Sequence, residues 1–136
     1  MSTFNRLTKV FKVSKEISFD DSSKFIFFSD CHRGDNSWAD DFARNQNLFY
    51  TALKYYYNNG FTYIEIGDGD ELWENRSLSN IIEMHNDTFL LMRKFHVKDR
   101  FYMIYGNHDI VKKSKKFIEK NLYQYFNENK EKYESL

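Results

Sequence analysis

Three short runs of mostly apolar residues divide the chain, and each has the length of a β-strand. They are Lys24–Asp30, Phe61–Asp68 and Arg100–Asn107, and all are rich in β-branched and aromatic side chains. Each run ends at a glycine or aspartate turn signal, which is typical of buried strands in an α/β sheet. The pattern therefore predicts three strands that lead directly into polar residues.

The segments between these runs carry apolar residues at helical spacing. One stripe consists of Trp38, Phe42, Phe49, Leu53 and Tyr56, and the next of Leu78, Ile81, Ile82, His85, Phe89 and Met92. Ser37 and Asp40 resemble a capping box at the start of the first helix, and Gly60 suits its end. We expect a third helix from Ile110 to Leu122 and an N-terminal helix over residues 3–16.

The spacing of the strand ends predicts a parallel sheet. Asp30 and Asp68 are 38 positions apart, and Asp68 and Asn107 are 39 apart, which leaves room for one crossover helix in each interval. Such crossovers are right-handed and place the strands side by side in parallel. We therefore predict the α/β class, with a parallel β-sheet and flanking helices.

No repeat, flexible linker or low-complexity tract indicates a domain boundary. Residues 1–136 are therefore expected to form a single domain. Within it we expect an appended helix in residues 1–20 and a core of βαβαβα order over residues 24–120.

Charge and cysteine content narrow the class of protein. The 20 basic and 20 acidic residues balance, so the chain carries no strong nucleic-acid or membrane-surface signal. A single cysteine excludes an internal disulfide framework, and the N-terminus lacks the apolar run of a signal peptide. No stretch approaches the roughly 20 apolar residues that cross a bilayer. We expect a protein of the reduced cytoplasm without a membrane segment.

Polar side chains of metal-binding type follow each predicted strand. Asp30 and His32 stand two positions apart, so an extended backbone directs both to one side. Asp68 follows the second strand, and Asn107 and His108 follow the third. The carboxyl ends of parallel strands meet at one edge of a sheet, so these side chains are expected to lie close together. Taken singly, each pattern is also compatible with a surface turn.

The order of the three motifs resembles a known family. The segments Asp30–His32, Gly67–Glu71 and Gly106–Asp109 match D-x-H, G-D-x-x-[DE] and G-N-H-[DE] without gaps. This order is similar to the signature of the calcineurin-like metallophosphoesterase superfamily, and Ser29–Asp35 resembles its bacterial members. The resemblance covers roughly residues 24–120 and implies the first half of a four-layer α/β/β/α fold.

The resemblance implies two divalent metal ions. Asp30, His32 and Asp68 would hold the first, and Asp68 and Asn107 the second. Manganese is favoured, with iron or zinc as alternatives, because carboxylate, amide and imidazole donors suit these metals. Such a pair of ions lowers the pKa of a shared water and generates hydroxide near neutral pH. The expected activity is hydrolysis of phosphomonoesters or phosphodiesters.

The resemblance also implies roles for residues beside the metals. His108 would act on the substrate, with Asp109 as the partner that orients it. Glu71 matches an acidic residue that supports the ligands from behind. Arg33 would either support the site in the same way or contact a phosphate oxygen.

The family pattern continues with a second set of strands, whose G-H and G-H-x-H motifs complete both metals. The present sequence has no histidine after His108, and we predict Lys112–Leu136 as a charged amphipathic helix. The 136 residues are therefore expected to be the N-terminal part of the family's domain, and hydrolysis is expected to need the later motifs. The alternative is a non-catalytic half-domain that binds metal and associates with itself through an uncovered sheet face. A nucleic-acid-binding module is the least favoured class.

Overall fold

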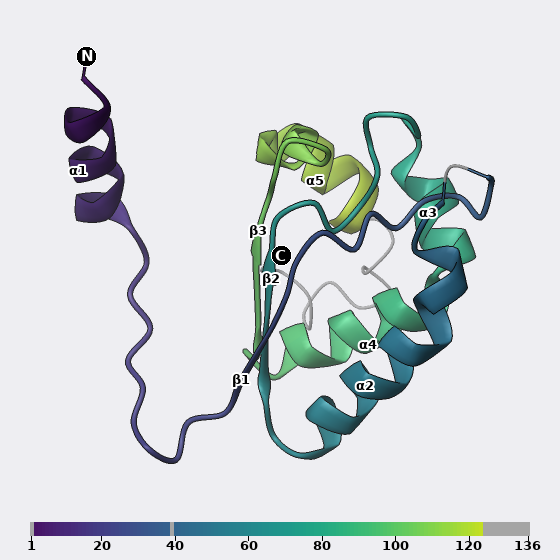
Figure 1. Ribbon diagram of the computed structural model, residues 1–136, viewed down its shortest axis with the longest axis horizontal. Helices are drawn as coiled ribbons and strands as arrows, with labels where there is room; N and C mark the ends of the chain where they lie inside the picture. The colour runs from purple at the N-terminus through teal and green to yellow at the C-terminus, as the bar shows by residue number, and fades with distance from the viewer. Residues whose placement is uncertain (1, 39, 124–136) are drawn as a thin grey trace.

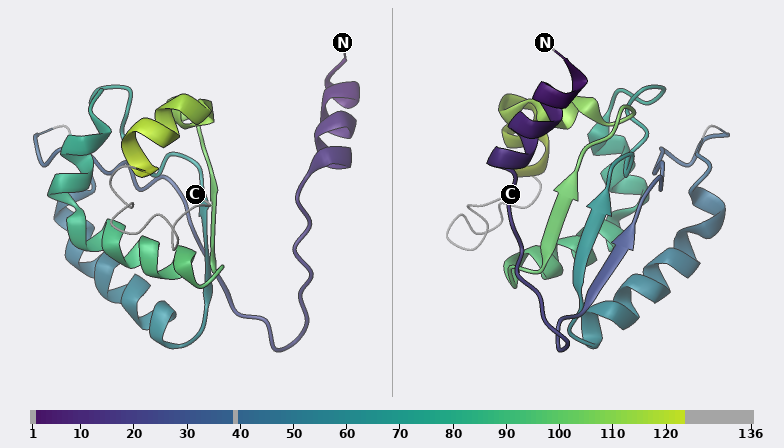
Figure 2. Two further views of the ribbon diagram at one scale, coloured as in Figure 1. Left: turned by 180° about the vertical axis from the view of Figure 1, so that it is seen from behind. Right: turned by 60° about the vertical axis from the view of Figure 1, so that its left-hand side comes forward.

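A computed structural model describes residues 2–38 and 40–123. At its centre is one parallel sheet in the order β1 (Phe25–Phe28), β2 (Thr62–Ile66) and β3 (Phe101–Ile104). The strands point the same way, so their carboxyl ends lie along one edge of the sheet (Figure 2). The predicted α/β class, with a parallel sheet and flanking helices, is confirmed.

Helices α2 (Gln46–Asn58) and α4 (Asn86–Val97) cover one face of the sheet (Figure 1). Leu53 of α2 and Phe95 of α4 lose all exposure where they pack around Tyr63 of β2. The burial of these side chains from water is the main favourable contribution to the association of helices and sheet. This cluster is the core that holds the strands in register.

A second cluster lies between α3 (Leu78–Met84), the start of α4 and the end of the described chain. It consists of Leu78, Ile81, Ile82, Phe89 and Leu122. Leu122 belongs to the last of three short helical segments, η2 (Ile110–Lys113), α5 (Lys115–Ile118) and η3 (Glu119–Tyr123). The cluster therefore anchors the chain that leaves β3 against α3 and α4.

The other face of the sheet is apolar and has no packed helix among the described residues. Strand residues alternate between faces, and Ile26 and Phe28 pack on the core, so their neighbours point the other way. Register places the following side chains on this open face: Phe25, Phe27, Ile64, Ile66, Tyr102 and Ile104. Phe27 and Ile104 are each more than half exposed.

Helix α1 (Thr3–Val13) stands on the open side of the sheet but apart from it (Figures 1 and 2). The Ser2 side chain caps it by accepting a hydrogen bond from the Asn5 N–H, and none of its residues is buried. Two residues after the end of the helix, the Lys15 ammonium lies 4.6 Å from the centre of the Tyr102 ring. The helix matches most of the one expected over residues 3–16, whereas the division of the chain into an appended helix and a core stays a prediction.

The helix expected from Trp38 onward begins later, at Gln46, after a 3₁₀ turn η1 (Ala43–Asn45). Asp40 lies before η1, where its Oδ1 accepts a hydrogen bond from the Ala43 N–H at 3.0 Å, and its Oδ2 lies 2.9 Å from Nε2 of His85. The segment before α2 is therefore held by the contact between Asp40 and His85 at the start of α4 and by the cap that Asp40 places on η1.

The other two predicted helices are interrupted. The second apolar stripe divides into α3 and α4 at His85, whose backbone leaves the helical region. In place of one helix, Ile110–Leu122 forms η2, α5 and η3. The helix predicted up to Leu136 extends into residues 124–136, which lie outside the described part of the chain. Within residues 2–38 and 40–123, no helix is long and apolar enough to cross a membrane.

Candidate metal centre

The loops that follow β1 and β2 hold predicted ligands in a strained backbone conformation. Asp30, His32 and Asp68 have φ angles of 52°, 49° and 50°. Residues other than glycine rarely adopt this left-handed region, and such strain concentrates at functional sites. The His32 N–H donates to the Asp68 carbonyl at 2.9 Å, so the two loops hold each other in this form.

The same three residues bring their donor atoms together. One donor atom each from Asp30, His32 and Asp68 lies within 4.8 Å of the other two. Nε2 of His32 is 3.9 Å from Oδ1 of Asp30. Ligands at about 2.0–2.2 Å from one divalent ion stand roughly 3–4 Å apart, so this set needs only small adjustments to hold a metal. The geometry therefore fits a divalent cation.

The loop after β3 reaches this cluster through a close backbone approach. The His108 N–H donates to Oδ1 of Asp68 at 2.7 Å, and the Leu72 N–H donates to the His108 carbonyl at 3.2 Å. A Cβ added at Gly106 would lie 2.2 Å from Oδ1 of Asp68, so only glycine allows the approach. Asn107 lies between Gly106 and His108 and is exposed, and its role as a ligand stays a prediction.

Glu71 holds both site histidines. Its Oε2 lies 3.0 Å from Nδ1 of His32 and 2.6 Å from Nδ1 of His108, and its Oε1 accepts hydrogen bonds from the N–H groups of Trp73 and Glu74. Burial alone would raise the pKa of Glu71, but the hydrogen bonds from His32, Glu74 and His108 outweigh it and lower the pKa. A carboxylate in this position leaves Nε2 of each imidazole for a metal or substrate.

The expectation that Asp109 orients His108 is corrected by this geometry, because Glu71 occupies that position. Asp109 has no exposed surface, and Nδ1 of His108 contacts Glu71. It accepts a hydrogen bond from the Gly106 N–H at 2.6 Å and pairs with the Lys112 ammonium at 2.8 Å. Asp109 therefore shapes the backbone of its loop.

Arg33 is also buried completely and cannot contact a phosphate from this position. Its guanidinium donates to both oxygens of Glu65, at 2.7 and 2.9 Å, and to Oδ1 of Asp70 at 2.7 Å. The Tyr63 hydroxyl donates to Glu65 at 2.5 Å. Burial opposes the charge of Arg33, but Asp70 and Glu65 outweigh it and raise the Arg33 pKa. Of the two expected roles, support of the site from behind is the one that this position allows.

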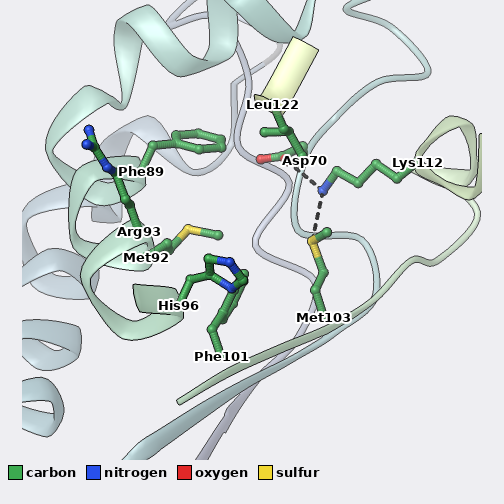
Figure 3. Close-up of a pocket in the computed structure, with 9 residues that line it drawn as sticks. All are labelled: Asp70, Phe89, Met92, Arg93, His96, Phe101, Met103, Lys112 and Leu122. Atoms are coloured by element: carbon green, nitrogen blue, oxygen red, sulfur yellow. Dashed lines mark hydrogen bonds and ion pairs between the residues drawn. The ribbon is translucent and has the colours of Figure 1, made fainter. Parts of the chain in front are cut away.

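Asp70 and Lys112 extend the buried charges toward the third loop (Figure 3). The Lys112 ammonium lies 2.6 Å from Oδ2 of Asp70. Burial would raise the pKa of Asp70, but Arg33 and Lys112 lower it to about 2. Neither Asp70 nor Lys112 stood out in the sequence. The sequence signals for this buried group were Glu65, a charged residue inside a strand, and the charged residues within or next to the motifs.

A groove of about 660 Å³ opens beside Asp30 and His32. Its other lining residues come from β1, the loop after it and the start of α2: Phe28, Ser29, Cys31, Asp41, Phe42, Asn45, Leu48, Phe49 and Ala52. Burial raises the pKa of the Cys31 thiol to about 11, so this residue is a poor nucleophile near neutral pH. The groove gives solvent and ligands access to the cluster.

Comparison with known proteins gives an independent assignment. A family model described as calcineurin-like phosphoesterase matches residues 23–136, which include all three strands and all three motif loops. No curated protein and no solved structure matched the chain. Proteins of this family are metal-dependent, in agreement with the cluster of donor atoms at the sheet edge. On the extent of this match, the chain belongs to the calcineurin-like phosphoesterase family.

Proposed function

We propose that this protein contributes the metal-binding half of a binuclear site that hydrolyses phosphomonoesters or phosphodiesters. The proposal rests mainly on Asp30, His32 and Asp68, whose donor atoms gather within 4.8 Å of one another on strained backbone. Strain of this kind persists only where the surrounding structure imposes it. The family match supports the same class of reaction.

In the proposed site, Asp30, His32 and Asp68 would hold one cation, and Asp68 and Asn107 would hold a second. Bound divalent cations would supply hydroxide near neutral pH and offset negative charge on the phosphoryl group. Manganese suits these oxygen and imidazole donors, with iron or zinc as alternatives. The Asp68 carboxylate accepts a hydrogen bond from the His108 N–H, and so it connects its own loop to the loop that carries Asn107.

His108 is the residue proposed to act on the substrate. Glu71 binds its Nδ1, and the Trp73 ring lies 4.5 Å from the centre of the His108 ring. These contacts fix the ring and leave Nε2 for a leaving oxygen. In its protonated form His108 would donate a proton to that oxygen.

The described ligands fall short of two complete coordination shells. Of the four histidines, His85 pairs with Asp40, and His96 lies in α4, where it lines a cavity with Met92 and Phe101. Neither is part of the cluster. We therefore propose that turnover needs histidines of the family's later G-H and G-H-x-H motifs.

Hydrolysis of p-nitrophenyl phosphate and bis(p-nitrophenyl) phosphate with added Mn²⁺ tests the proposal. We expect little turnover from the 136-residue chain and clear turnover from a polypeptide that also carries the later motifs. Asp68→Ala in the longer form should abolish turnover, whereas Asp87→Ala, at an exposed position of α4, should not. Turnover that survives Asp68→Ala would refute the site.

Self-association is a second candidate, favoured by the open apolar sheet face. Monomeric proteins rarely expose contiguous apolar patches beyond a few hundred Å², and such patches usually mark interaction surfaces. Phe27 and Ile104 on this face are 53% and 56% exposed.

The proposal also includes a cytoplasmic location, which is supported by the lone cysteine.

A further inference from the structure

Five buried charges form a chain beneath the predicted ligands: Glu65, Arg33, Asp70, Lys112 and Asp109. Their signs alternate, and each neighbouring pair of charged atoms is 2.6–2.8 Å apart. Buried charges are stable only when each is paired and hydrogen-bonded, so the chain forms as a unit. It runs under all three motif loops.

Each loop contributes a member of this chain directly beside its predicted ligands. Arg33 follows His32 in the first loop. In the second loop Asp70 stands two residues after Asp68, and in the third Asp109 follows His108. A shift of any of these charges would therefore move a ligand or the substrate-facing histidine.

Lys112 is one of three side chains that join the second loop to the third, and the other two, Asp68 and Glu71, both contact His108. The Lys112 side chain is almost completely buried, and its ammonium lies 2.6 Å from Oδ2 of Asp70 (Figure 3). The same ammonium lies 2.8 Å from Oδ2 of Asp109, so it bridges the two carboxylates. The first and second loops are also joined by Arg33 and by the hydrogen bond from the His32 N–H to the Asp68 carbonyl. Among the three side chains that join the second loop to the third, Lys112 is the one that carries a positive charge, and it pairs with one carboxylate from each loop.

Removal of this charge would leave the Asp70 and Asp109 carboxylates facing each other without a cation between them. Like charges at such a separation in a buried site repel, and the repulsion would move the two loops apart. Asp68 and the Asn107–His108 pair would separate with them. Residues that orient metal ligands typically change metal affinity by about 10–100-fold when they are replaced.

We propose that Lys112 is a positioning residue that holds the Asp68 loop against the Asn107–His108 loop and so sets the metal affinity of the site. This inference rests on the proposed metal site and adds to it a residue outside the three motifs. Lys112 touches neither substrate nor metal in this scheme. It acts through Asp70 and Asp109.

Titration of the 136-residue chain with Co²⁺ tests the proposal, with affinity read by calorimetry and coordination read from the Co²⁺ absorption bands. Lys112→Met should weaken binding by about 10–100-fold and change the absorption bands. The new side chain would meet Phe89, Met92 and Met103, which line the cavity beside Lys112. Lys113→Met is the matched control, because Lys113 is exposed on the same turn.

A second variant covers the case in which Lys112→Met does not fold. The double variant Lys112→Met/Asp109→Asn removes the bridge together with one of the carboxylates that it neutralises, so the buried chain keeps its net charge. It should fold, as circular dichroism can show, and still bind Co²⁺ at least about 10-fold more weakly than the Lys113→Met control.

Each outcome decides between the two proposals. Folded variants that bind Co²⁺ as tightly as the control, with the same absorption bands, would overturn the role of Lys112 and leave the metal site intact. If the unsubstituted chain itself does not bind Co²⁺, the proposed function fails, and the role of Lys112 fails with it.

Discussion

Glu71 determines how both site histidines present their rings. One carboxylate oxygen accepts from Nδ1 of His32 and of His108, and the two rings stand edge to face with centres 4.5 Å apart. A carboxylate that binds Nδ1 favours the tautomer with hydrogen on that atom, which leaves Nε2 as the metal-binding or catalytic nitrogen. The orientation of both histidines therefore depends on a single side chain.

Replacement of Glu71 by alanine should release both rings. We expect ¹⁵N NMR spectra of Glu71→Ala to show mixed tautomers for His32 and His108, while His85, which pairs with Asp40, keeps its pattern. Affinity for Mn²⁺ should fall by about 10–100-fold. Unchanged tautomers in the variant would mean that Glu71 does not orient the rings.

At the level of the secondary-structure elements, the turn after β3 depends on a glycine for its approach to Asp68. Gly106→Ala would place a methyl group 2.2 Å from Oδ1 and 2.8 Å from the backbone nitrogen of Asp68, so both the Asp68 side chain and the backbone must move. We expect a loss of about 1–3 kcal/mol in unfolding free energy and a large loss of Mn²⁺ affinity.

Gly60→Ala provides the matched comparison. Gly60 has φ of +79° after α2, with no atom within 4 Å of an added Cβ. The left-handed backbone should cost about 1–2 kcal/mol in this variant, with no change in metal affinity. If urea unfolding and calorimetry showed equal losses of metal affinity in both glycine variants, the close approach at Gly106 would not matter for the site.

The position of His96 in α4 predicts a pH dependence of stability. Burial lowers the pKa of His96, partly opposed by Asp99. As the pH falls through 6.5, the ordinary pKa of histidine, His96 therefore becomes protonated in the unfolded chain before it does so in the folded chain. The contribution of neutral His96 to the free energy of unfolding is therefore complete above pH 6.5. It is lost as the pH falls toward the lower pKa that His96 has in the folded chain.

Urea unfolding at about pH 7.5 and about pH 5 measures this effect. The wild-type chain should lose more unfolding free energy between the two conditions than His96→Gln, which cannot take up the proton. Equal losses in the two proteins would contradict the depressed pKa of His96.

The sequence predicted which segments form the site better than it predicted the contacts between their side chains. Apolar runs that end in polar residues are enough to predict strand ends at one edge. Asp30 and His32 do lie close together, but the extended backbone predicted between them is wrong, because both residues are left-handed. The partners of Asp109 and Arg33 depend on which way each side chain turns within a buried loop. A local pattern carries no information on that choice, so the contact of Glu71 with both histidines and the roles of Asp70 and Lys112 became visible only in three dimensions.

The helix boundaries failed for a related reason. The stripe from Leu78 was correct as an indicator of a buried face, whereas the stripe from Trp38 was wrong at its first member, because Trp38 is 96% exposed. The helices begin or break near Asp40 and His85, whose side chains contact each other in the core. Such a pair joins positions 45 residues apart and has no signature in a window of helical length.

For the whole molecule, the open sheet face predicts self-association. Sedimentation velocity of the 136-residue chain should show species larger than the monomer at micromolar concentration. Phe27→Lys/Ile104→Lys should shift the distribution toward the monomer, since both side chains lie on that face. Val97→Lys is the control and should leave the distribution unchanged, because Val97 is exposed at the end of α4 and not on the open face. If the wild-type chain sediments as a monomer, self-association through this face is contradicted.

The common cation pocket at the sheet edge is the central claim, and paramagnetic broadening by Mn²⁺ tests it most directly. A ¹⁵N-labelled chain is titrated with Mn²⁺ while the signals of its four histidines are followed. We predict that His32 and His108 broaden first, together with the backbone signals of Asp30 and Asp68, while His85 and His96 persist. Broadening centred on His85 or His96, or none at all, would contradict the account.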